Sequence, residues 1–166
     1  TRAHLVEAAA SRRHERKFPK KHIDRRRAVR VHSRQMSTEY NVNEYRQQRL
    51  ANLRALEEQG YKPYGQAFAR SGTLGELLDR FEEGREVAAS GRLMAVRAMG
   101  KSLFADLRDG SGRMQIYLGK KDLSEKDFAA FRLLDVGDHI GVSGRMFVTR
   151  MGERSIHVTG WELLAK

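Results

Sequence analysis

The stretch LFADLRDGSGRMQIYL, residues 103–118, decides the fold. Apolar residues alternate with polar or aromatic ones on both sides of DGSG, residues 109–112. A turn sequence of this kind between two alternating runs is typical of a β-hairpin. We therefore predict two short strands, over residues 103–108 and 113–118.

The flanking sequence extends this hairpin into a larger sheet. Three more strands are predicted, over residues 86–98, 139–149 and 155–164. Gly91 is the expected bulge or bend of the first strand. Residues 122–134 predict a helix with Ser124 as its N-cap. The order of three strands, a helix and two strands matches the five-stranded Greek-key barrel called the OB-fold. A mainly β protein with helices is expected, and a generic α+β domain is the structural alternative.

Helices precede the predicted barrel. One is expected from Thr38 or Asn43 to about Gln59, and a second starts at Thr73, where Thr73 and Glu76 form a capping box. Three parts follow from this pattern: a basic, disordered extension (1–35), a helical lead-in (36–85) and an OB-fold domain (86–166).

The charge of the chain is concentrated in the extension. Of the net charge of +11, residues 1–35 supply +9, from 12 Lys and Arg against 3 Asp and Glu. An electrostatic arm for phosphates is one interpretation. A targeting segment, or upstream sequence from outside the native protein, is the other. The chain has no cysteine and no apolar run long enough to span a membrane, so we expect no disulfide, no thiol catalysis, no membrane partner and a cytoplasmic location.

Alternation places a group of ring-bearing and polar side chains on the outer face of the hairpin. Phe104 and Tyr117 point outward from adjacent strands, and Gln115 lies diagonally from Phe104. An unstacked base could stack on Phe104, and the donor and acceptor of Gln115 complement uracil. Glu153 could accept the N3 hydrogen of a pyrimidine, and Arg97 could hold a phosphate or a base carbonyl. Alternatively, the N-terminal helix covers Phe104.

Five segments, together with the helix over residues 44–60 and the Pro63-Tyr64 that follows it, carry a resemblance to a known family. The five segments are GRLMAVRAMGKSLF (91–104), DGSGRMQIY (109–117), DVGD (135–138), GVSG (141–144) and TRMGERSI (149–156). They resemble the N-terminal, anticodon-binding region of class II lysyl-tRNA synthetase, and the resemblance covers roughly residues 38–166. Aspartyl- and asparaginyl-tRNA synthetases share this domain. Their first strand carries Gly-Trp and Arg-Arg-Asp, where this chain has Gly91-Arg92 and Met99-Gly100-Lys101.

The resemblance implies a function and a set of binding residues. The domain would bind the anticodon loop of tRNA(Lys), which is rich in uridine. Phe104 would stack on a base, Gln115 would read it, and Arg97 and Glu153 would contact the central anticodon base. Lys101 and Arg113 are possible phosphate contacts.

The resemblance also implies what the complete enzyme would add. It would join lysine to tRNA with ATP and Mg²⁺ through a lysyl-adenylate, as a homodimer. We identify no catalytic or metal residues in residues 1–166, so this fragment alone is predicted to be inactive, without a cofactor of its own. Two further alternatives remain open: a free-standing OB-fold protein that binds any single strand, and an OB-fold domain whose outward aromatics bind a protein.

Overall fold

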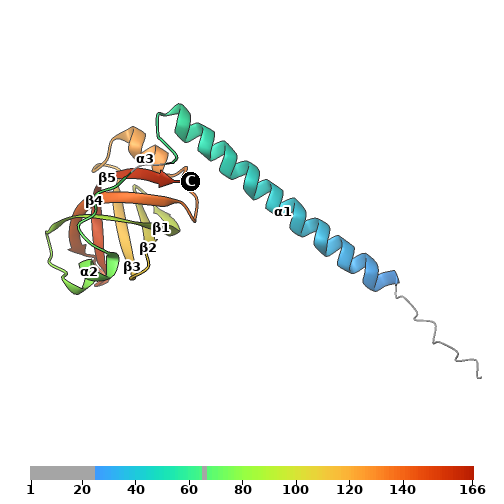
Figure 1. The fold of residues 1–166 in the computed structure, drawn as a ribbon, viewed down its shortest axis with the longest axis horizontal. Coiled ribbons are helices and arrows are strands. Elements are labelled where there is room, and N and C mark those ends of the chain that lie inside the picture. The colour runs from blue at the N-terminus through green and yellow to red at the C-terminus, as the bar shows by residue number, and fades with distance from the viewer. Residues whose placement is uncertain (1–24, 65–66) are drawn as a thin grey trace, which may run out of the picture. The chain divides into compact units, whose positions relative to one another are not determined.

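The computed structural model describes residues 25–64 and 67–166 (Figure 1). Its described part contains five strands that close into a barrel in the order β1-β2-β3-β5-β4. Their bounds are β1 Glu86–Met99, β2 Ser102–Arg108, β3 Arg113–Gly119, β4 His139–Val148 and β5 Arg154–Ala165. All five lie within one or two residues of the predicted strands. The predicted mainly β, OB-type barrel is confirmed.

The barrel interior is built from alternate residues of the hairpin. The inward side chains are at most 1% exposed: Leu103, Ala105, Leu107, Met114, Ile116 and Leu118. Burial of one face of each strand fixes the register, because a slip of one residue would exchange the two faces. Phe104 consequently pairs with Tyr117, and Asp106 with Gln115. The predicted outward face is therefore confirmed.

β1 passes from one partner strand to another. It pairs with β4 as far as Arg92 and with β2 from Arg92 onward. Of the bulge or bend predicted at Gly91, the bulge is wrong: the register shifts between Leu93 and Ala95. Gly91 instead allows close approach, since a Cβ there would lie 2.8 Å from the carbonyl oxygen of Arg108.

The long helix α1 spans Arg25–Glu58. The predicted start at Thr38 or Asn43 is wrong, because residues 25–58 contain no glycine or proline and are rich in good helix formers. Residues 25–35 of the extension predicted to be disordered are thus helical, and residues 1–24 lie outside the described residues. The part from Val42 onward belongs to the same compact unit as the barrel, Val42–Lys166.

A partly buried polar network fastens α1 to the barrel. Arg49 donates to Asp138 at 2.9 Å, and Asn52 donates to Asp135 at 3.0 Å. The Lys166 ammonium group, whose side chain is 3% exposed, contacts both carboxylates. Leu56, about one turn after Asn52 on the same helix, is fully buried in the core.

Two short helices complete the fold. α2 (Leu74–Asp79) has the capping box of Thr73 and Glu76 that the sequence predicted. α3 (Glu125–Phe131) begins after the predicted N-cap, Ser124, so its predicted start at residue 122 is wrong. The extended backbone of an N-cap residue requires the helix to begin after it. In Figure 1, α2 and α3 lie at different ends of the barrel.

Candidate nucleic-acid interface

A cavity of about 650 Å³ opens on the outer face of the barrel, and we call it the base cavity. Its walls come from β1, β2, β3, the end of β4 and the turn between β4 and β5. Four of the six predicted site residues line it: Arg97, Phe104, Gln115 and Glu153. The lining contains no residue of α1, so the alternative in which that helix covers Phe104 is wrong for the described part of the chain.

An aromatic cluster forms one wall of the base cavity. The ring centroids of Phe104 and Tyr117 lie 5.1 Å apart, and Tyr117 also meets the edges of Phe147 and His157. The Tyr117 hydroxyl lies 3.0 Å from Ser102 Oγ. Phe104 is half-buried and therefore both fixed by its neighbours and accessible from the cavity. Such a fixed ring is a suitable platform for a base.

Polar residues form a second part of the site. Gln115 Nε2 donates to Glu153 Oε2 at 3.0 Å and to Ser155 Oγ at 3.3 Å. The parallel pairing of β3 with β5 brings Ser155 beside Gln115. Gln115 is 7% exposed, so its amide is held in one orientation at the wall of the cavity. The Glu153 carboxylate retains further acceptor capacity, because a carboxylate can accept about four hydrogen bonds.

The two predicted arginines meet at one buried carboxylate. Arg97 donates to both oxygens of Asp106, at 3.1 and 3.4 Å, and Arg113 Nη2 lies 3.0 Å from Asp106 Oδ2. Asp106 is only 4% exposed. It therefore positions Arg97 at the rim of the base cavity. Arg113 does not line the cavity, and neither does Lys101, which lies in the turn between β1 and β2.

Several residues of the site are not predicted from the sequence. Ser155 and Asp106 hold Gln115 and Arg97, while Phe147, Thr149, Arg150 and Met151 complete the cavity wall. Alternation along β4 is a signal for Phe147. Its neighbour Met146 points inward and is fully buried, so Phe147 points to the outer face. Nothing local in the sequence indicates the contact of Ser155, which depends on pairing between strands that are distant in the sequence.

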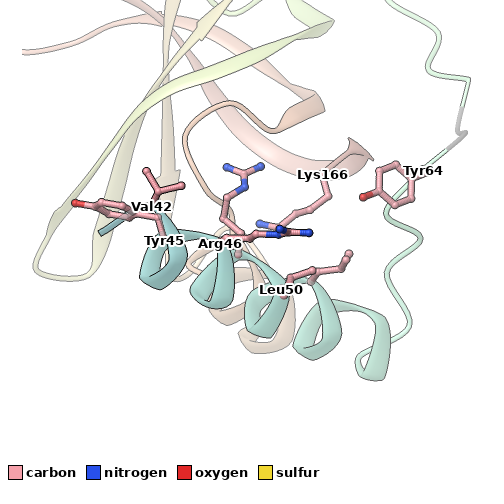
Figure 2. Close-up of a pocket in the computed structure, with 8 residues that line it drawn as sticks. Val42, Tyr45, Arg46, Leu50, Tyr64 and Lys166 are labelled. Carbon is pink, nitrogen blue, oxygen red and sulfur yellow. The ribbon is translucent and has the colours of Figure 1, made fainter. Parts of the chain in front are cut away.

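A second concave region lies along α1, and we call it the helix groove (Figure 2). Val42, Tyr45, Arg46 and Leu50 project from α1, and Tyr64 and Lys166 lie across from them. It contains none of the predicted site residues.

No helix in the described part of the chain has the length and apolar character that crossing a membrane requires.

The fold and the site together define the class of protein. Residues 67–164 match the model of the family described as OB-fold nucleic acid binding domain, of the tRNA anticodon type. The chain belongs to this family.

Curated relatives make the resemblance specific. The chain is 40% identical over 130 residues to a lysine–tRNA ligase of Pelotomaculum thermopropionicum, covering 77% of this chain and 26% of that protein. It is 41% identical over 127 residues to a lysine–tRNA ligase of Carboxydothermus hydrogenoformans, covering 75% and 26%. It is 42% identical over 124 residues to lysine–tRNA ligase 2 of Methanosarcina acetivorans, covering 71% and 24%. The chain thus spans about a quarter of the length of these relatives. The predicted resemblance to the N-terminal, anticodon-binding region of lysyl-tRNA synthetases is confirmed.

Proposed function

We propose that this chain recognises the anticodon loop of tRNA(Lys) by holding a uridine in the base cavity. The observation that carries the proposal is that one cavity is lined by an aromatic ring, Phe104, and by an amide, Gln115, whose orientation is held by Glu153. A ring beside a fixed hydrogen-bonding edge matches an unstacked base, which offers a flat face and a polar edge.

The polar groups favour uracil over cytosine. Uracil has a donor at N3, and the carboxylate of Glu153 and the amide oxygen of Gln115 are both acceptors. Cytosine has an acceptor at N3, which would meet an acceptor and leave both unpaired. An unpaired buried partner costs about 1–3 kcal/mol. Arg97, positioned by Asp106, supplies a donor for a carbonyl or a phosphate of the bound nucleotide.

The resemblance extends the proposal to a complete protein. That protein would join lysine to tRNA(Lys) with ATP and Mg²⁺, as a homodimer in the cytoplasm. The present chain would supply recognition and no adenylate formation. This part of the proposal is supported by the resemblance to lysine–tRNA ligases alone.

Binding to matched RNA stem-loops tests the proposal. The loops differ only in the central anticodon base, which is uridine, cytidine or adenosine, and affinity is measured by fluorescence anisotropy. We expect the uridine loop to bind about tenfold more tightly, which corresponds to about 1.4 kcal/mol. Equal affinity for all three loops would contradict the proposal and favour a free-standing protein that binds any single strand.

A further inference from the structure

A second hollow lies beside the base cavity, with a volume of about 340 Å³. Three cationic side chains line it, Lys101, Lys120 and Arg132, together with one acid, Glu125. Phe128 contributes its apolar lining. This second hollow contains none of the four residues that we assign to the base.

One turn separates the second hollow from the base cavity. Met99 at the end of β1 and Ser102 at the start of β2 line the base cavity, whereas Gly100 and Lys101 in the turn between them line the second hollow. A strand of RNA whose base enters the base cavity would therefore meet Lys101 where its backbone leaves. The neighbouring nucleotide would then lie over the second hollow.

The backbone of the barrel holds two of the three cations side by side. Ser102 pairs with Gly119 across β2 and β3, and Lys120 N donates to Lys101 O at 2.9 Å. Arg132 follows α3, with its guanidinium carbon 5.6 Å from the centre of the Phe128 ring. The three cations thus come from two turns and the end of a helix, and they converge on one hollow.

The ion pair between Glu125 and Lys120 in the second hollow is weak. Lys120 Nζ lies 3.1 Å from Glu125 Oε1, but the two side chains are 50% and 85% exposed. An ion pair with this exposure contributes little, about 0–1 kcal/mol. A phosphate could therefore take the place of Glu125 at Lys120 for a small cost. Three cations against one exchangeable acid give the hollow a net positive charge.

We propose that the second hollow binds the backbone phosphate of the nucleotide adjacent to the one in the base cavity. Lys101, Lys120 and Arg132 provide the charge. The site recognises the ribose-phosphate chain of single-stranded RNA and not the identity of its bases. The inference rests on the proposed function, because the path of the RNA strand is traced from a base held in the neighbouring base cavity.

Salt dependence of binding tests this subsite. Lys101→Ala combined with Arg132→Ala should reduce the magnitude of the slope of log affinity against log salt by about 0.7, since the hollow is assigned one phosphate and each single-strand phosphate contact contributes about 0.7. Lys121→Ala is the matched control, because Lys121 is exposed, follows Lys120 directly and does not line the hollow. We expect the double variant to retain the preference for the uridine loop. A slope equal to that of Lys121→Ala would overturn the proposal.

A second variant, Glu125→Gln, should strengthen binding instead of weakening it. It removes the acid from the hollow and frees Lys120, so the affinity for the stem-loop at low salt should rise several-fold. A purely structural role for the Lys120–Glu125 pair would leave the affinity unchanged or lower it, and either result would overturn the proposal. Thermal unfolding of each variant confirms that it is folded.

The two proposals fail in different ways. If the unmodified chain binds uridine and cytidine loops equally, the proposed anticodon function fails, and the slope still reports on the second hollow. If the uridine preference holds and the slope does not change, only the second hollow fails.

Discussion

Phe104 on β2 lies directly opposite Tyr117 on β3, with the two ring centroids 5.1 Å apart and the planes tilted by 57°. Tyr117 is in turn held by the edges of Phe147 and His157. The His157 ring is itself fixed, because its Nε2 lies 2.8 Å from Asp122 Oδ2. The platform that we assign to the base therefore rests on a chain of contacts from four strands, β2 to β5.

Phe104→Ala removes the stacking platform. It should weaken binding of every stem-loop by about 1–3 kcal/mol, because stacking does not depend on which base is bound. The ratio of affinities for uridine and cytidine loops should change little. Phe104→Tyr keeps an aromatic face and should bind nearly as the unmodified chain does. If Phe104→Ala abolished only the uridine preference, the assigned role of stacking would be wrong.

Asp106→Asn tests the positioning of Arg97. The substitution removes the charge that holds Arg97 and Arg113. Two cations would then be uncompensated, so the dependence of affinity on salt should become steeper. The preference for uridine should fall, because Arg97 would no longer be held at the rim of the base cavity. Titrations at several salt concentrations measure both quantities, and an unchanged slope together with an unchanged preference would refute the role.

Asp138→Ala should destabilise the fold strongly. Asp138 is 0% exposed and contacts both Arg49 and the buried Lys166. Removing one partner of a buried ion pair leaves an uncompensated charge and costs about 3–5 kcal/mol. Glu86→Ala is the control, because the Glu86–Arg145 pair is exposed and should cost less than about 1 kcal/mol. Urea unfolding measures the free energy of unfolding of both variants. Similar losses of stability would contradict the role of Asp138 as the partner of a buried charge.

Stability in acid should depend on Asp127. A hydrogen bond from the Ser124 hydroxyl, followed by one from the Tyr61 hydroxyl, holds the pKa of Asp127 below its ordinary value. A carboxylate with a lowered folded-state pKa adds stability above its unfolded pKa of about 3.9, and this stability is lost as the pH falls through the folded value.

The corresponding measurement is the free energy of unfolding between neutral pH and pH 2. Asp127→Asn cannot titrate, so its stability should be lower at neutral pH and should vary less below about pH 4. Asp79→Asn makes the same change of charge at an exposed position on α2. If the two variants gave the same profile below pH 4, the assigned contribution of Asp127 would be wrong.

The sequence predicted the parts of the structure that local patterns determine. Alternation around the DGSG turn gave the pairing of Phe104 with Tyr117, and Thr73 with Glu76 gave the start of α2. It did not predict the bulge between Leu93 and Ala95, because the bulge occurs where β1 has just changed its partner strand. The start of α1 at Arg25 is not predicted, because a dense run of charge is typical of disorder as well as of helix, and arginine favours helix formation.

The candidate site was predicted only in part, because local patterns reveal which residues of a strand point outward but not which side chains support them. Four of the residues that line the base cavity were predicted. Arg97, Phe104 and Gln115 lie on strands whose alternation is visible in the sequence, and Glu153 lies in the turn that follows β4. The supporting contacts were not visible. Ser155 reaches Gln115 through the parallel pairing of β3 with β5, and Asp106 holds Arg97 across β1 and β2. The contact of Ser155 depends on pairing between strands that are distant in the sequence, and the contact of Asp106 depends on the register of β1 and β2 after the bulge. Sequence spacing reveals neither.

The most direct test of the account combines Gln115→Ala with a change of the central anticodon base. The affinities of both proteins for uridine and cytidine stem-loops form a double-mutant cycle. We predict that Gln115→Ala costs about 1–2 kcal/mol on the uridine loop and much less on the cytidine loop, so that the preference of the unmodified chain nearly disappears. If Gln115→Ala weakens both loops equally and the preference remains, Gln115 does not read the base, and the central claim is contradicted.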